Sequence, residues 1–148
     1  MYHEESIEIG AESGAVFDLV SDLGRMGEWS PENNGGQWLN GGNGAVGDQF
    51  NGLNRIGERE WSVVAEVTVA DRGSEFQFVT GPAETPFVRW TYRMETHSAG
   101  TRLTEVWDVE VLPGTLQTFS EEQLGQRAEA VKASMQATLA GVKASAES

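Results

Sequence analysis

The sequence predicts an α+β fold in which a strongly curved antiparallel sheet of seven strands wraps around a long C-terminal helix. Segments between residues 48 and 111 alternate apolar and polar side chains, as strands with one buried face do. The end of the chain instead carries apolar residues at helical spacing, and two short helical segments separate the first strand from the second. No linker-like stretch divides the 148 residues, so we expect a single domain over residues 1–148.

The N-terminal part predicts one strand followed by the two short helices. Residues 6–9 alternate polar and apolar side chains, and we place the start of this strand near Tyr2. Gly10 ends it, and Ser13 is placed to cap a short helix that carries apolar residues to position 20. A second helical segment, Asp22 to Glu28, stops before Pro31, since a proline disfavours helical backbone in the preceding residue.

The remaining strands predict a sheet that is apolar on one face only. Within the Gly- and Asn-rich residues 31–47 we expect one short strand at Gln37 to Leu39. Five longer strands follow. Their inward-facing residues are Phe50, Gly52 and Asn54; Trp61, Val63, Ala65, Val67 and Val69; Phe76 and Phe78; Val88, Trp90, Tyr92 and Met94; and Leu103, Glu105, Trp107, Val109 and Val111.

The C-terminal helix is predicted to cover that apolar face. Ser120 and Gln123 form a capping-box pattern, in which each side chain hydrogen-bonds to the backbone of the other residue. The apolar residues that follow recur at intervals of three or four and so share one side of a helix. They are Leu124, Ala128, Val131, Met135, Leu139 and Val142.

Charge and composition exclude several classes of partner. The net charge of -13, from 23 acidic and 10 basic residues, repels nucleic acid and anionic membranes. The sequence has no cysteine, no N-terminal signal pattern and no run of about 18 apolar residues, so we expect a cytoplasmic protein without stable membrane association. His3 and His97 are isolated, and we predict neither a metal nor a cofactor. The sequence leaves open whether the chain is a monomer or a homodimer.

The inward aromatic residues predict a pocket between sheet and helix. Large rings face a helix whose apolar residues are mostly Ala, Val, Leu and Met, and one helix across a concave sheet leaves space at one end. Each ring by itself is explained by packing in the core. The pocket hypothesis therefore depends on the whole set.

Four polar or amphipathic side chains are candidates for contact with a ligand. Glu105 is the one acidic residue on the inward face of its strand, and we favour an ion pair with Arg59, because buried charges are usually paired. If Glu105 is buried without a partner, its pKa rises and the neutral acid can donate to a ligand oxygen. Asn54 and Tyr92 could each hydrogen-bond a ligand, although contacts with backbone and packing explain them as well.

Several local motifs, in the same order along nearly the whole chain, resemble those of a known family. The sequence is similar to the polyketide cyclase/dehydrase and lipid transport branch of the START-related SRPBCC superfamily, whose members have the helix-grip fold. The motifs are Val16 to Asp22, Glu28 to Pro31, Val46 to Gly52, Asn54 and Arg55, Trp61, Trp90 to Arg93, and Gly100 to Glu105.

The resemblance implies a cavity more than a particular reaction, since the superfamily includes both binding proteins and enzymes. In the family arrangement Trp29 is part of a pocket lid, or it only anchors the second short helix. Our prediction is a carrier or sensor for a hydrophobic lipid or polyketide-like molecule. One alternative is a cyclase or dehydratase that uses Glu105 or Tyr92 as acid or base, and another is a protein-interaction module. The residues expected at the ligand are Trp29, Phe50, Asn54, Arg59, Trp61, Phe78, Trp90, Tyr92, Glu105, Trp107, Met135 and Leu139.

Overall fold

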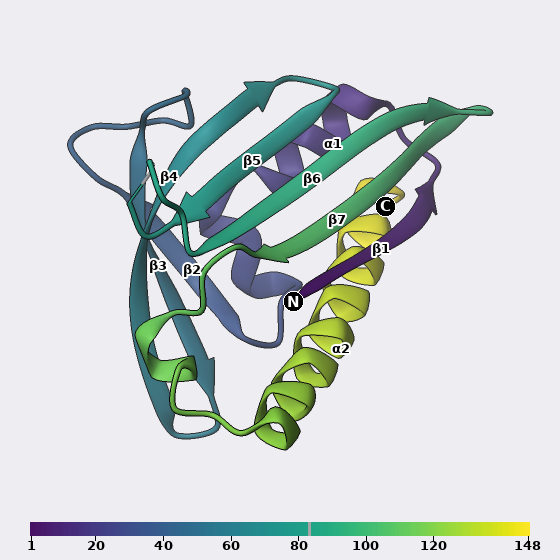
Figure 1. Ribbon diagram of the computed structural model, residues 1–148. Helices are drawn as coiled ribbons and strands as arrows, with labels where there is room; N and C mark the ends of the chain where they lie inside the picture. The colour runs from purple at the N-terminus through teal and green to yellow at the C-terminus, as the bar shows by residue number, and fades with distance from the viewer. Residues whose placement is uncertain (83) are drawn as a thin grey trace.

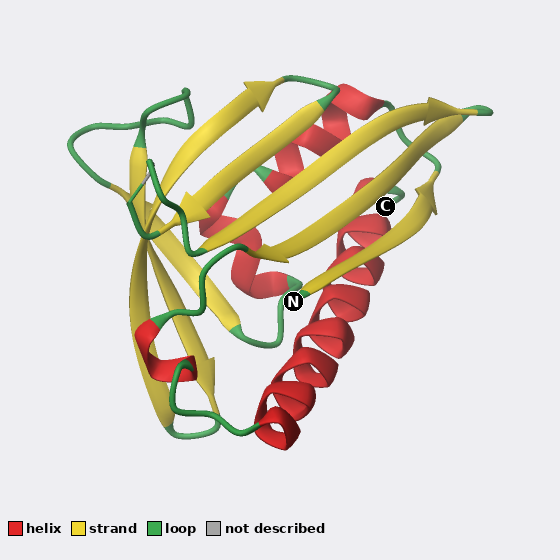
Figure 2. Cartoon of the chain, viewed as in Figure 1, coloured by secondary structure: helices red, strands yellow, loops and turns green. Residues whose placement is uncertain are grey.

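The computed structural model describes residues 1–82 and 84–148. It contains one seven-stranded sheet, two α-helices and two 3-10 helices (Figures 1 and 2). In chain order the elements are β1 (Tyr2–Ile9), α1 (Ser13–Val20), η1 (Leu23–Glu28), β2 (Asn33–Trp38), β3 (Gln49–Ile56), β4 (Arg59–Asp71), β5 (Glu75–Thr80), β6 (Val88–His97), β7 (Gly100–Val109), η2 (Gly114–Leu116) and α2 (Glu121–Ala146).

The sheet is antiparallel throughout and confirms the predicted helix-grip fold. Its strand order is β1-β7-β6-β5-β4-β3-β2, so the N-terminal strand lies beside the last one and the rest follow as a meander. The sheet curls, and the single helix α2 crosses its concave side (Figure 1). Because β1 lies next to β7, the first and the last strand of the chain pair with each other at one edge of the sheet.

Two strand boundaries differ from those expected. The strand predicted at Gln37 to Leu39 spans Asn33–Trp38 instead, because Asn33 and Gly36 already pair with β3 although this stretch carries no alternating pattern. A register shift between Asn33 and Gly36 also removes the period of two. At the other end of the sheet, Val111 lies beyond β7 and is exposed, so its predicted inward position was wrong.

Of the two predicted helix caps, the one at α2 is confirmed and the one at α1 was wrong. The capping box of Ser120 and Gln123 is present at the start of α2, as predicted. Ser13, by contrast, does not cap α1, because Glu12 occupies the cap position and makes no side-chain bond there. The Ser13 hydroxyl instead hydrogen-bonds to the hydroxyl of Thr101 on β7, at 3.0 Å.

Only the C-terminal half of α2 packs into the core. Its buried residues, Val131, Met135, Thr138, Leu139 and Val142, all come after residue 130. Leu124 and Ala128 belong to the same predicted stripe but are only half-buried. The first turns of α2 therefore extend along an end of the sheet that the helix does not close.

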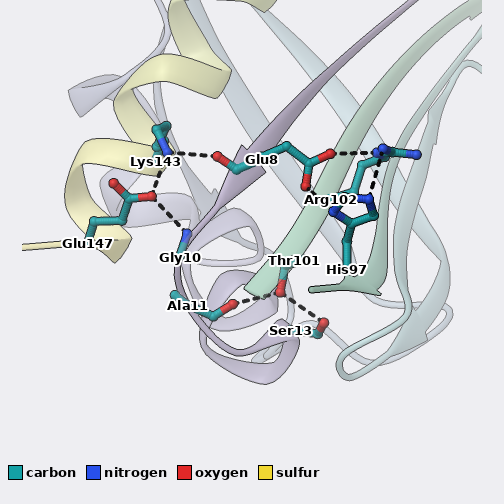
Figure 3. Close-up of polar contacts among 9 residues, drawn as sticks. All are labelled: Glu8, Gly10, Ala11, Ser13, His97, Thr101, Arg102, Lys143 and Glu147. Atoms are coloured by element: carbon teal, nitrogen blue, oxygen red, sulfur yellow. Dashed lines mark hydrogen bonds and ion pairs between the residues drawn. The ribbon is translucent and has the colours of Figure 1, made fainter. Parts of the chain in front are cut away.

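Polar contacts hold the opposite end of α2 against the start of the chain (Figure 3). The Lys143 amine donates to the backbone carbonyl of Glu8 at 2.8 Å and to the Glu147 carboxylate at 2.6 Å. That carboxylate also accepts the backbone N–H of Gly10 at 2.8 Å. Close by, the buried Thr101 hydroxyl donates to the carbonyl of Ala11 at 2.7 Å. These bonds join α2, β1, α1 and β7, so this end of the molecule is closed.

Trp29 anchors η1 to α2. It is buried, and its indole N–H donates to the Ser145 hydroxyl at 2.9 Å. The ring packs directly on the backbone of Gly141, where an added Cβ would lie 2.9 Å from Trp29 Cβ and Cδ1. A glycine is therefore needed at this point of the helix to let the ring approach.

We predict that Gly141→Ala lowers the free energy of unfolding by about 1 to 3 kcal/mol, because the new methyl group displaces Trp29. Gly125→Ala is the matched control in the same helix, since nothing lies within 4 Å of its added Cβ. The control should raise stability by about 0.5 to 1 kcal/mol through helix propensity. Urea denaturation of both variants measures the difference. Equal stabilisation by both substitutions would contradict close packing of Trp29 on α2.

Candidate functional site

A cavity of about 1020 Å³ lies between the concave face of the sheet and α2. Its wall is built from β3 to β7, from η1 and the loop after it, from the segment that includes η2, and from α2. This volume is at the upper end of the range for small-molecule sites. α2 contributes Arg127 from its first half and Ser134, Met135, Thr138 and Val142 from its second half to the wall, so the cavity runs along the same part of the helix that packs into the core.

The structure brings eleven of the twelve predicted site residues together in the wall of this cavity. They are Trp29, Phe50, Asn54, Arg59, Trp61, Phe78, Trp90, Tyr92, Glu105, Trp107 and Met135. Leu139 is the exception. It is buried in the main core cluster together with Val16 and Leu103, where α2 meets α1 and β7, and it does not line the cavity.

Other residues of the wall were missed from the sequence. Glu32 and Asn33 come from the loop that precedes β2 and from its first residue, and Leu116 and Phe119 come from the segment between β7 and α2. The last two are half-buried apolar residues in a stretch without a strand or helix pattern. Apolar side chains in such a loop were the available signal that the loop covers something.

Glu105 lies at the inner wall without a charged partner. Its side chain is 3% exposed, and its Oε2 accepts a hydrogen bond from the Tyr92 hydroxyl at 3.0 Å. Glu105 and Tyr92 are direct cross-strand neighbours on β7 and β6, which places both side chains on the concave face. Within the part of the chain that the structure describes, Oε1 of Glu105 is buried with no hydrogen-bond partner.

The predicted ion pair between Glu105 and Arg59 was therefore wrong. Arg59 is the first residue of β4 and is exposed, and its guanidinium stacks over the Trp61 ring at 5.2 Å from the centroid. Both residues were predicted to face inward from the alternation along their strands, but β4 and β7 are not neighbours in the sheet. Alternation along a strand determines the face of the sheet on which a side chain lies. It does not determine the distance between that side chain and a residue on another strand.

Burial determines the protonation of this pair. Removal of the carboxyl group from water raises the pKa of Glu105 to about 8, and the hydrogen bond from Tyr92 opposes this rise only in part. Burial and the neighbouring Glu105 raise the pKa of Tyr92 well above its usual value. At neutral pH the wall therefore presents two neutral groups that carry dissociable protons.

A half-buried ion pair joins the loop before β2 to the first half of α2 at the wall of the cavity. The Arg127 guanidinium binds both carboxylate oxygens of Glu32, at 2.7 and 3.0 Å. The two side chains are 25% and 17% exposed, respectively. Residues 121–130 of α2 contribute no buried side chain. This ion pair is therefore a main contact between that part of the helix and the loop before β2.

Asn54 lines the cavity on β3, opposite Trp61 of β4. Among residues 1–82 and 84–148 its side chain makes no hydrogen bond, so the expected contact with nearby backbone is not formed. The amide is half-buried and free to bind a polar group that enters the cavity.

Nowhere in the described part of the chain do three or more Asp, Glu or His side chains gather closely enough to hold a metal ion. Within the same residues, no helix has both the length and the apolar character needed to cross a membrane.

A sequence profile of the family described as polyketide cyclase/dehydrase and lipid transport matches residues 3–147. The chain belongs to this family. The match covers every element that lines the cavity, so the resemblance seen in the local motifs extends over the whole domain. A comparison with curated proteins finds no match.

Solved structures of the same fold include proteins of this family. The Polyketide_cyc-like protein Cgl2372 of Corynebacterium glutamicum is 33% identical, with a TM-score of 0.65, over 96% of this chain and 88% of the other. The ZhuI aromatase/cyclase of Streptomyces sp. R1128 is 14% identical, with a TM-score of 0.73, over 99% and 93% of the two chains. The di-domain aromatase/cyclase StfQ of the steffimycin pathway is 12% identical, with a TM-score of 0.77, over 99% of this chain and half of the other. The latter two show the fold alone.

The buried carboxyl group predicts a specific pH dependence of stability. Between the pKa of an ordinary Glu, 4.5, and about 8, the folded state keeps a proton on Glu105 that the unfolded state has lost. The contribution of Glu105 to the free energy of unfolding therefore falls by roughly 1.4 kcal/mol per pH unit as the pH rises through this window. Above the window this contribution no longer changes. Glu105→Gln should remove this contribution, so the free energy of unfolding of the variant should rise relative to that of the wild type as the pH increases.

Urea denaturation at a series of pH values from 4 to 9 measures the effect. The difference in unfolding free energy between variant and wild type is the quantity to follow, because contributions from other titrating groups cancel in it. A difference that does not change with pH would show that Glu105 is ionised in the folded protein at neutral pH.

Proposed function

We propose that the chain binds a hydrophobic small molecule, such as a lipid or a polyketide-like compound, as a carrier or sensor. The observation that carries this proposal is the cavity of about 1020 Å³ between sheet and helix, with a wall of mainly aromatic and aliphatic side chains. Burial of an apolar ligand against such a wall is favourable by roughly 25 cal/mol per Å² of apolar surface removed from water. The family description, which includes lipid transport, supports the same function.

The charged groups of the wall support binding over catalysis. Arg127 and Glu32 neutralise each other, and Arg59 stacks on Trp61 at an exposed position. Among the described residues, the wall contains no cysteine or histidine, and none of its serine or threonine hydroxyls hydrogen-bonds to a carboxylate or an imidazole. The cavity thus lacks the paired nucleophile and base that covalent catalysis requires.

A cyclase or dehydratase activity is the second candidate, and the Glu105–Tyr92 pair favours it. A neutral carboxylic acid at the wall of an apolar cavity can protonate a carbonyl or leaving hydroxyl oxygen, and Tyr92 holds it in place through Oε2. A pKa of about 8 keeps Glu105 protonated for this role at neutral pH. The cavity would then bend a flexible substrate into a reactive shape. Similarity in fold to aromatase/cyclases is in accord with this candidate.

For the binding function we predict that filling the cavity abolishes ligand binding. Ser134 lines the cavity on α2, and Ala137 is exposed on the same helix. With palmitic acid or an aromatic polyketide at about 100 times its Kd, thermal unfolding of the wild type should shift upward by roughly 6 to 10 °C. Ser134→Trp should reduce this shift strongly, and the control Ala137→Trp should keep it.

Native mass spectrometry of the purified protein provides an independent check, since a bound molecule adds its mass to the chain. If no compound of a lipid and polyketide panel raises the melting temperature, and no added mass is found, the carrier proposal fails for these classes.

For the enzymatic candidate we predict that Glu105→Gln lowers kcat by about 10² to 10⁴, with a smaller effect on KM, for any bound compound that the protein converts. Gln keeps the size of the side chain but has no acidic proton. Tyr92→Phe should have a smaller effect, because it removes only the group that orients the acid. Turnover by the Gln variant at the wild-type rate would exclude Glu105 from the chemistry.

A further inference from the structure

Among the described residues, one fully buried polar side-chain atom has no hydrogen-bond partner, and its residue lines the cavity. Oε1 of Glu105 is buried and makes no hydrogen bond within residues 1–82 and 84–148, whereas Oε2 accepts the Tyr92 hydroxyl. A buried polar group without a partner is costly, and such groups are few in native proteins. The same residue lines the cavity, so a ligand in the cavity is the natural partner.

We propose that Oε1 of Glu105 is a hydrogen-bond donor that selects an uncharged ligand with a carbonyl oxygen on the part that reaches the inner wall. This inference deepens the proposed binding function and rests on it. It names the chemical class of the ligand: a largely apolar molecule that carries a carbonyl group, as opposed to a pure hydrocarbon or a cationic amine.

The hydrogen bond from Tyr92 fixes which oxygen carries the proton. Because Oε2 accepts from the Tyr92 hydroxyl at 3.0 Å, the acidic proton of the neutral carboxyl group belongs on Oε1. Only one oxygen of Glu105 is held, so the carboxyl group can turn slightly to meet a ligand that lies against the wall. Side-chain adjustments of this size are common on binding.

The surroundings of Glu105 keep it neutral and therefore a donor. Tyr92 faces it from β6. On β1, Glu5 lies directly opposite and His3 lies opposite Trp107, and Glu5 is hydrogen-bonded to His3 and to Gln136 of α2. Of the positive groups of α2 near this edge, Lys132 acts on Glu5, and Lys143 binds the carbonyl of Glu8 and the Glu147 carboxylate.

Among the described residues no cation pairs with Glu105, and removal of its carboxyl group from water opposes its ionisation. A carboxylate at this place would attract an amine. A neutral carboxyl group attracts an oxygen acceptor instead, which is the reason for assigning a carbonyl-bearing ligand.

Three matched probes test the assignment: 2-acetylanthracene, 2-isopropenylanthracene, in which CH₂ replaces the carbonyl oxygen, and 1-(2-anthryl)ethylamine, a cation. Their Kd values are measured by fluorescence titration at pH 6 with the wild type, Glu105→Leu and Glu105→Gln. The hydrocarbon probe tests the proposed function, because it needs only the apolar cavity. The ratio of its Kd to that of the ketone tests the donor.

The ratio of the hydrocarbon Kd to the ketone Kd should be about ten times larger in the wild type than in Glu105→Leu. Tenfold corresponds to the contribution of one hydrogen bond. The improvement should disappear as the pH rises through about 8, because the carboxylate can no longer donate. Glu105→Gln keeps a donor group and should retain part of the preference without the pH dependence. Thr104→Val, which removes a polar group from the opposite face of β7, should leave the ratio at the wild-type value.

Each other outcome overturns a distinct statement. If the hydrocarbon binds but the ratio is the same in the wild type and Glu105→Leu, the donor assignment fails while the binding function stands. A preference for the amine that grows above pH 8 also overturns it, since Glu105 would then act as a carboxylate. If neither ketone nor hydrocarbon binds, the proposed function fails for aromatic ligands, and the assignment fails with it.

Discussion

One geometric constraint determines the rest of this structure: a single helix has to cover the concave face of a seven-stranded sheet that is wider than the helix. A helix with its side chains is about 10 to 12 Å across, whereas seven strands span about 30 Å. α2 packs its second half tightly, with five buried residues after position 130, and three of them, Met135, Thr138 and Val142, also line the cavity. The cavity is the part of the concave face that the helix does not cover.

The two ends of α2 accordingly have different kinds of contact. At the C-terminal end, the contacts of Lys143 and Glu147 with β1 and the packing of Trp29 on Gly141 fix the helix in place. At the N-terminal end, the half-buried pair of Arg127 and Glu32 spans the cavity wall, and no apolar side chain of that stretch is buried. One ion pair contributes much less to stability than a packed core does. Opening of the cavity therefore loses the fewest contacts at the N-terminal end of α2.

The same curvature explains why Glu105 is buried without a counter-ion. Its neighbours on the concave face are a tyrosine on β6 and an acid on β1, and the arginines of the wall lie on β4 and α2, away from β7. A neutral carboxyl group in an apolar wall is destabilising for the fold, and it is the kind of polar group that orients a ligand in a mainly apolar site.

Local patterns in the sequence were enough to predict the architecture and most of the cavity wall. Alternation along the strands assigned Trp61, Trp90 and Trp107 to one face, and the capping box located the start of α2, because these patterns depend only on local geometry. Which of the inward residues touch one another could be read only from the folded arrangement. It separated Arg59 from Glu105, moved Leu139 into the core, and brought Glu32 to Arg127, which are far apart in the chain. Periodicity gives the direction of a side chain, whereas the distances between side chains depend on how the sheet curves and where the helix crosses it.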